Sequence, residues 1–310
     1  MKWFKLTVCV LLMVLCACPV QAAEALIPGG QLIGMTLETG VFTVAAFEEQ
    51  SPARDAGVRI GDRLVSVNGE KIQSLGQLET LLEKASVARL ELRRGEEILS
   101  LEVPVEGRLG IYLKQGISGV GTVTYYDPEK MTFGALGHGV CDKNGALLAF
   151  TRGDVLDAAV RSVKKGLSGI PGQLMGVVDE KVHLGPLEKN TLQGVFGTMK
   201  ALPKIAPVPV AESHEVRTGD AMIRCTLAGA VPGEYSVRIL KVYPGSDTRN
   251  LLVKVTDPAL LEATGGIVQG MSGSPIIQDG KLVGAVTHVL VNDPTTGYGI
   301  FIENMLDAAA

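Results

Sequence analysis

A short turn near the C-terminal end of the chain combines residue types that suit acyl-transfer chemistry. In Gly270-Met271-Ser272-Gly273-Ser274-Pro275, two serines stand among small residues, and an apolar run follows. Acyl transfer needs a hydroxyl on a tight turn, with backbone N–H groups that point at the developing oxyanion. Small neighbours let such a backbone approach a scissile carbonyl. The turn therefore offers a candidate nucleophile.

The same hexapeptide resembles the nucleophile loop of trypsin-like peptidases, whose usual form is Gly-Asp-Ser-Gly-Gly-Pro. The resemblance implies that Ser272 is the nucleophile and that the amides of Gly270 and Ser272 form the oxyanion hole. A strand, a turn at Asp279-Gly280 and a strand over 282–286 follow, which is also the trypsin-like order. Ser274 is an alternative nucleophile, and a purely structural turn is the other interpretation.

A serine nucleophile needs a general base, and the chain has four histidines. His138 ends a predicted strand far ahead of the serine, where a trypsin-like domain carries its base in the first barrel. His288 ends the strand after the nucleophile turn and is an alternative base that could line the cleft. His183 and His214 have polar neighbours in the sequence and are expected on the surface.

The carboxylate that orients the base should lie between His138 and Ser272 if the His-Asp-Ser order of such peptidases holds. Asp257 ends the run 251–255 and precedes Pro258, so its side chain is expected at a strand end near the loop. The pattern alone does not choose among the candidates, which are Asp142, Asp154, Asp157, Asp179, Asp220, Asp247 and Asp257.

The elements that must hold these residues are predicted to be mostly β-strands. The chain has 38 glycines and few aromatic residues, and turn signals separate its short β-branched runs. No long helix is predicted over 107–310. We expect a trypsin-like double β-barrel there, with a domain boundary near Gly107.

The segment before that boundary follows a different pattern. A short helix starting at Ser51-Pro52 precedes a strand and the hairpin signal Asn68-Gly69. A second helix begins with capping-box spacing at Ser74-Leu75-Gly76-Gln77 and gathers apolar residues of 75–85 on one face. With the strand pair that follows, residues 30–105 resemble a PDZ domain, an α+β module.

PDZ domains bind a peptide as an added strand beside the second helix, and a loop of backbone amides holds the peptide carboxylate. The resemblance places this loop at 31–35, with Ile33, Gly34 and Met35 as peptide-binding residues. A module that packs against its neighbour without binding a peptide is the alternative.

Longer motifs resemble the stage IV sporulation protein B family of serine peptidases over nearly the whole chain. The motifs are the PDZ-like segment, FGALGH at 133–138, Val255-Thr256-Asp257-Pro258, the run 264–275 and GAVTHVLVNDPTTGYGIFIE at 284–303. Carried over residue by residue, the resemblance implies His138 as the catalytic histidine, Asp257 as the acidic residue and Ser272 as the serine.

The family resemblance also implies a biological role that composition and spacing do not show. It implies export into the space between the forespore and mother-cell membranes, followed by self-cleavage. It further implies cleavage of a membrane-bound regulator of an intramembrane protease, which then processes a late sporulation sigma factor. The segment before Gly34 is the expected site of self-cleavage, because Pro28, Gly29 and Gly30 discourage regular structure there.

The N-terminal residues have the pattern of a targeting segment. Two lysines precede an apolar run over 6–18 that is too short to span a bilayer comfortably. Small residues predict cleavage after Ala22, which makes 1–22 a signal peptide. An uncleaved anchor and a lipid attached at Cys16 are the alternatives. Cys141 and Cys225 would then be the remaining cysteines, as one disulfide or as buried thiols, and no metal or cofactor is expected.

The composition argues against nucleic acid as a partner, because the net charge is −4 and no basic run is dense enough to follow phosphates. Protein substrates are expected instead. A binding scaffold with a degenerate peptidase domain is a second hypothesis, which the intact serine turn and the histidine disfavour. A periplasmic-type quality-control protease is a third, although such proteases usually carry the PDZ domain after the catalytic domain.

Overall fold

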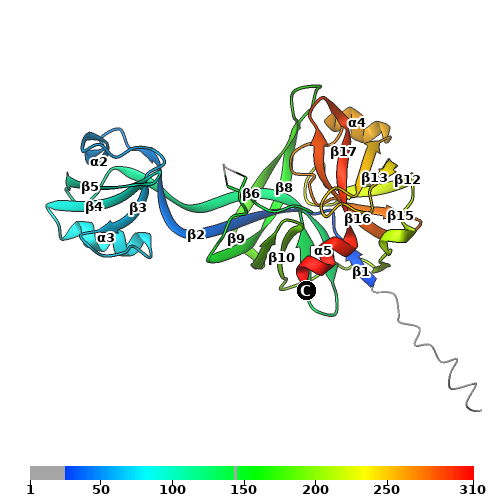
Figure 1. The fold of residues 1–310 in the computed structure, drawn as a ribbon, viewed down its shortest axis with the longest axis horizontal. Helices are drawn as coiled ribbons and strands as arrows, with labels where there is room; N and C mark the ends of the chain where they lie inside the picture. The colour runs from blue at the N-terminus through cyan, green and yellow to red at the C-terminus, as the bar shows by residue number, and fades with distance from the viewer. Residues whose placement is uncertain (1–24, 143–144) are drawn as a thin grey trace, which may run out of the picture.

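The computed structural model describes residues 25–142 and 145–310, so the predicted targeting segment 1–22 lies outside the described residues. The chain forms a small lobe and a large lobe, which two long strands connect (Figure 1). Within the described ranges, no helix is long and apolar enough to cross a membrane.

The first half of the large lobe is a ring of six strands. Strand β6 pairs with β7 on one side and with β2 on the other, and this double pairing closes the ring β6-β7-β10-β9-β8-β2. Its strands are β2 (Leu32–Phe47), β6 (Ile111–Asp127), β7 (Thr132–Ala135), β8 (Arg152–Lys164), β9 (Gln173–Thr191) and β10 (Gly194–Thr198). Alternate side chains point inward, and Ile33, Met35 and Phe133 belong to the resulting core.

The second half is a closed barrel in the order β12-β13-β14-β17-β16-β15. Its strands are β12 (Gly219–Cys225), β13 (Gly233–Val242), β14 (Leu251–Val255), β15 (Pro275–Gln278), β16 (Lys281–Leu290) and β17 (Asp293–Phe301). Helix α4 (Pro258–Thr264) follows β14, and helix α5 (Ile302–Ala309) begins directly after β17. The predicted mostly β chain with a double barrel and an α+β module is confirmed.

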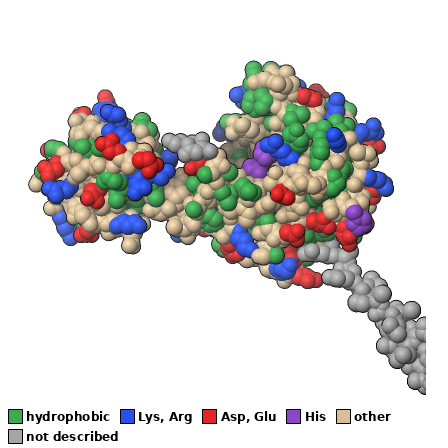
Figure 2. Space-filling model, in the orientation of Figure 1, with side chains coloured by type: hydrophobic (Ala, Val, Ile, Leu, Met, Phe, Trp, Pro, Cys, Tyr) green, Lys and Arg blue, Asp and Glu red, His purple; other side chains and the backbone are tan. Residues whose placement is uncertain are grey.

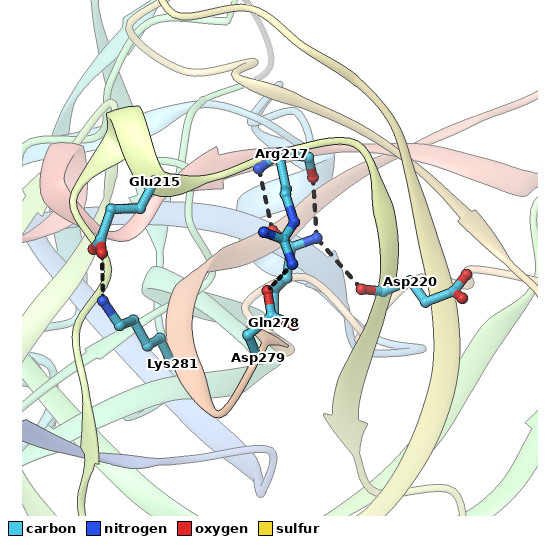
Figure 3. A network of polar contacts seen from close by, with 6 residues as sticks. All are labelled: Glu215, Arg217, Asp220, Gln278, Asp279 and Lys281. Atoms are coloured by element: carbon cyan, nitrogen blue, oxygen red, sulfur yellow. Dashed lines mark hydrogen bonds and ion pairs between the residues drawn. The ribbon is translucent and has the colours of Figure 1, made fainter.

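The seam between β12 and β15 is short, because only Met222 and Ile223 pair across it. A polar network beside it joins the segment before β12, which includes the 3-10 helix η1 (Ser213–Glu215), to the β15–β16 hairpin (Figure 3). The buried amide of Gln278 donates to the carbonyl of Arg217 and accepts from its N–H, at 3.0 and 3.2 Å. Ion pairs Arg217–Asp279 and Lys281–Glu215 add to this closure.

The small lobe, residues 42–113, contains α2 (Pro52–Asp55), β3 (Arg63–Val67), α3 (Leu75–Glu83), β4 (Val87–Arg94) and β5 (Glu97–Pro104). The local signals behave as predicted. The Ser51 hydroxyl accepts from Arg54 N–H and the Ser74 hydroxyl accepts from Gln77 N–H, both at 3.2 Å. Asn68-Gly69 turns with positive φ at both residues.

The strand pairing differs from the predicted division into 30–105 and 107–310. The first part of β2, residues 32–38, pairs with β6 and β8 inside the first barrel, and only its second part enters the small lobe. The small lobe is therefore an insertion between two strands of that barrel. Sequence alternation looks the same along both parts of β2, so it does not show where the strand changes partners.

The expected self-cleavage segment is also more ordered than its glycines indicate. Strand β1 (Ala25–Pro28) pairs with β6 and with β11 (Val208–Pro209), and Leu26 is fully buried. Gly29 and Gly30 also donate to carbonyls of β6, at 2.9 and 2.8 Å, and Gly34 lies within β2. Cleavage between Ala25 and Gly34 would therefore require paired backbone to leave the sheet.

Candidate active site

The nucleophile turn lies between the two barrels and depends on glycine. Gly270 and Gly273 both have φ of +96°. A Cβ atom on Gly273 would lie 2.0 Å from the carbonyl oxygen of Thr122 in β6. Because that neighbour is a backbone atom of β6, it cannot shift without distorting the strand, and only glycine fits there. The turn is therefore closely packed against the first barrel.

The two serines of the turn have different environments. Ser274 is 0% exposed, and its hydroxyl donates to the Met271 carbonyl at 2.6 Å. Ser272 is half-buried and lines a cavity of about 350 Å³ between the barrels. Ser274 thus holds the shape of the turn, whereas Ser272 is the serine that a substrate could reach.

The amides predicted for the oxyanion hole belong to this same loop. Within the described residues, neither the N–H of Gly270 nor that of Ser272 donates to an acceptor. The peptide plane before Gly270 is oriented by a hydrogen bond from Leu174 N–H to the Gln269 carbonyl, at 2.8 Å. Unpaired N–H groups beside a nucleophile are what stabilisation of an oxyanion requires.

His138 reaches the same cavity from the first barrel. After β7, Leu136 and Gly137 have positive φ values of 70° and 67°, and they turn the chain toward the second barrel. Nδ1 of His138 lies 3.0 Å from the Gly139 carbonyl oxygen. Because a carbonyl only accepts, Nδ1 carries the proton, and Nε2 is left with the lone pair of a general base.

His288, the alternative base, lies beside His138 with ring centroids 5.0 Å apart and planes tilted by 40°. Burial, together with the nearby His138 and Arg249, lowers the pKa of His288 to about 4. His288 is therefore neutral near pH 7, and it lies beside the base without being one of the residues that line the cavity. Figure 2 shows a histidine next to a basic side chain on the visible face of the large lobe.

The Ser272 hydroxyl donates to the carbonyl oxygen of Thr287 at 2.6 Å. The serine and the histidine share a cavity, but the serine proton points to the backbone of β16. For acyl transfer the Ser272 side chain must rotate so that its hydroxyl donates to His138.

The structure does not bring Asp257 to the histidine. One carboxylate oxygen of Asp257 accepts from the N–H groups of Ala259 and Leu260, at 2.9 and 3.1 Å, and caps α4. The other accepts from Ser236 N–H. Over the described parts of the chain no carboxylate contacts His138, whose Nδ1 is bound by Gly139 instead. Asp257 does lie just after the end of a strand, as predicted, but its side chain points into the cap of α4.

Asp257 variants separate a capping role from a catalytic one. Asn caps helices about as well as Asp does, but its NH2 group cannot accept from Ser236 N–H. Asp257→Asn should therefore lose roughly 1 kcal/mol of unfolding free energy, measured in urea, and keep its activity, and Asp257→Ala should lose roughly 2 kcal/mol. If Asp257→Asn stayed folded and lost its activity, the carboxylate would instead have the role that the family resemblance implies.

The pH dependence of activity should reflect the burial of His138. Burial lowers the pKa of His138, and the hydrogen bond to Gly139 offsets this only in part. A lowered pKa keeps the base neutral to more acidic pH than an ordinary imidazole, whose pKa is about 6.5. We expect the acid limb of kcat/KM for a small ester to have its midpoint below about 6.5. A midpoint above neutral pH would indicate a carboxylate partner in the working enzyme.

The residues predicted to bind a peptide lie in the first barrel and not in the PDZ-like lobe. Ile33 and Met35 are buried in the first barrel, and Gly34 packs against Val178. Both edges of this part of β2 are already paired, with β6 and with β8. No edge remains for an added strand, so Ile33, Gly34 and Met35 do not form the peptide-binding loop of a PDZ domain, although Met35 lines the cavity that holds Ser272 and His138.

A groove of the kind in which PDZ domains bind a peptide lies beside α3 in the small lobe. Its cavity of about 280 Å³ lies between α3 and the segment 107–113 and is lined by Leu75, Leu78 and Leu82. Residues 111–114 of β6 pair with β2 on one edge only, so the edge on the α3 side is open. Gly107 and Gly110, with φ of +80° and +68°, shape the loop before this strand. That glycine spacing ahead of an apolar strand is the signal that sequence reasoning missed.

The two cysteines outside the N-terminal segment are free thiols. Cys141 lines the cavity that holds His138 and Ser272. Cys225 is fully buried in the second barrel, and burial raises the pKa of its thiol to about 12. The buried-thiol interpretation holds for Cys225.

Comparisons with known proteins agree with this architecture. A family model described as SpoIVB peptidase S55 matches residues 105–306, and a PDZ domain model matches 43–94. No curated protein matches the chain.

Among solved structures, the chain is similar to the Rv3671c protease. The inactive form shares 14% identity over 61% of this chain and 82% of that chain, with a TM-score of 0.36. The active form from M. tuberculosis shares 17% identity over 63% and 75%, also with a TM-score of 0.36. The family match, by contrast, spans more than half of the chain. The chain therefore belongs to the SpoIVB peptidase S55 family and is a serine peptidase with a PDZ domain.

Proposed function

We propose that this serine peptidase cuts peptide bonds by acyl transfer to Ser272, with His138 as the general base. One observation carries the proposal: Ser272 and His138 line one cavity, beside two backbone amides that have no acceptor in the described part of the chain. A nucleophile, a base and an oxyanion site in one place are the parts that acyl transfer needs.

In the first step, Ser272 Oγ bonds to the scissile carbonyl carbon as its proton passes to Nε2 of His138. The carbonyl oxygen becomes an oxyanion, which the N–H groups of Gly270 and Ser272 stabilise. Collapse of this intermediate breaks the C–N bond, and His138 returns the proton to the leaving amine. Water then attacks the acyl-enzyme, with His138 taking its proton and passing it to Ser272 as the ester breaks.

The protonated Nδ1 of His138 has a defined task in these steps. The Gly139 carbonyl holds the Nδ1–H, and it therefore fixes the tautomer and the ring orientation that a carboxylate fixes in other triads. A carbonyl is neutral and stabilises an imidazolium less than a carboxylate does. The dyad that this geometry supports is the working hypothesis, and Asp257 as a third member remains a proposal from the family.

Family membership supports a role in sporulation signalling. In this proposal the exported enzyme acts between the forespore and mother-cell membranes. It cleaves itself and then a membrane-bound regulator of an intramembrane protease that processes a late sigma factor. Because β1 is paired, self-cleavage fits best before Ala25. The open groove of the PDZ domain supports recognition of a protein partner by strand addition.

A groove variant should separate partner recognition from chemistry. Leu75 is 48% exposed at the groove, so Leu75→Glu adds a charge there without emptying the core. We expect roughly ten-fold weaker turnover of a protein substrate at low concentration, and unchanged hydrolysis of a small ester. Leu167→Glu, at a leucine that is 59% exposed and lies outside the groove, is the control. Equal loss of both activities would mean that the lobe supports the catalytic fold instead.

A fluorophosphonate probe, which reacts with activated serines, tests the central proposal. The wild type should take up one equivalent, Ser274→Ala should still react, and Ser272→Ala should not. Labelling that persists in Ser272→Ala would mean that another residue is the nucleophile. A wild type that never reacts would favour the scaffold hypothesis.

A further inference from the structure

One buried side chain of the first barrel binds the nucleophile loop of the second barrel directly. Thr122 lies in the middle of β6 and is 1% exposed. Its hydroxyl donates to the Gly270 carbonyl at 2.7 Å, and its N–H donates to the Ser272 carbonyl at 3.0 Å. Its own carbonyl accepts from Leu136 N–H at 3.2 Å, two residues before His138. Thr122 therefore contacts both segments that bear the proposed catalytic groups.

These hydrogen bonds act on the direction of the Ser272 amide. The Gly270 carbonyl belongs to the peptide plane before Met271, and the Ser272 carbonyl belongs to the plane before Gly273. The plane that carries the Ser272 N–H lies between these two planes. Because peptide units are rigid, fixing the flanking planes limits the direction in which the middle N–H can point.

The contact is close as well as polar. A Cβ on Gly273 would lie 2.0 Å from the Thr122 carbonyl oxygen and 2.5 Å from the Leu136 nitrogen. Gly270, with φ of +96°, is a residue whose backbone would adopt other conformations easily without an external constraint. The hydroxyl of Thr122 is the side-chain donor that supplies this constraint at the Gly270 carbonyl.

We propose that Thr122 is a positioning residue for the peptidase reaction, because it holds the nucleophile loop in the form whose amides face the oxyanion. This inference rests on the proposed roles of Ser272 and of the amides of Gly270 and Ser272. Thr122 touches no reacting atom. It acts through the loop, in the same way in acylation and in deacylation, since both steps pass through an oxyanion.

The strand offers a matched control two residues away. Thr124 is also buried in β6 at 0% exposure, and its hydroxyl has no partner among the described residues. Thr122→Val and Thr124→Val make the same isosteric change at the same depth. Only the first removes a hydrogen bond to the nucleophile loop.

The test measures kcat and KM for a small ester, with active sites counted by fluorophosphonate titration. Thr122→Val should lower kcat per titrated site at least ten-fold and leave KM within about two-fold. Thr122→Ser, which keeps the hydroxyl, should restore kcat to within a few-fold of the wild type, and Thr124→Val should be unchanged. If Thr122→Val does not fold, Thr122→Ala is measured with the same expectation.

The outcomes separate this inference from the proposed function. An unchanged kcat in Thr122→Val, or an equal loss in Thr124→Val, would overturn the positioning role while Ser272→Ala stayed inactive. A loss that Thr122→Ser does not restore would also overturn it. Activity that survives in Ser272→Ala would overturn the proposed function itself.

Discussion

Ser272→Ala is expected to lower kcat for peptide hydrolysis by roughly 10⁴- to 10⁶-fold, as the loss of a serine nucleophile does in other peptidases. The fold should survive, because the Ser272 hydroxyl makes one hydrogen bond, to the Thr287 carbonyl, and the residue is only half-buried. The measurement is turnover of a peptide substrate together with a thermal unfolding curve.

Ser274→Ala is the matched control for that experiment. The Ser274 hydroxyl is buried and donates to Met271, so its removal should cost roughly 1 kcal/mol of unfolding free energy. Activity should fall far less than in Ser272→Ala. The assignment of the nucleophile would be wrong if Ser274→Ala lost all activity with an intact fold and Ser272→Ala stayed active.

His138→Gln should be nearly as damaging as Ser272→Ala, because it removes the group that takes the serine proton. The losses should not add: the double variant His138→Gln/Ser272→Ala should be about as slow as either single variant, since the groups of such a site act as a unit. The measurement is kcat for the same peptide in all three variants, with circular dichroism to verify folding.

His288→Gln is the control for the histidine. His288 stacks near His138 and is neutral near pH 7, but within the described residues it donates to no group of the nucleophile loop. We therefore expect a much smaller loss than in His138→Gln. If His288→Gln silenced the enzyme while His138→Gln did not, the base would be His288.

Much of the small lobe could be predicted from the sequence. Caps and turns depend on residues a few positions apart, and Ser51, Ser74 and Asn68-Gly69 behave in the structure as their types indicate. The resemblance of six residues around Ser272 pointed for the same reason to the loop that we propose carries the nucleophile: a tight turn needs small residues at fixed positions. His138 followed from its place at a strand end, ahead of the serine.

What only the tertiary structure decided depends on contacts between distant residues. Local pattern did not show that β2 changes partners along its length, so the peptide groove was assigned to Ile33–Met35 instead of to the edge of β6 beside α3. The direction of the Asp257 side chain followed from the helix it caps. Thr122 and Gly270, 148 residues apart, meet because two barrels close against each other. The sequence by itself determined the turns, the strands and the reactive residue types. Their partners came from strand pairing and barrel packing, since alternation specifies the inward face of a strand and leaves its neighbour unspecified.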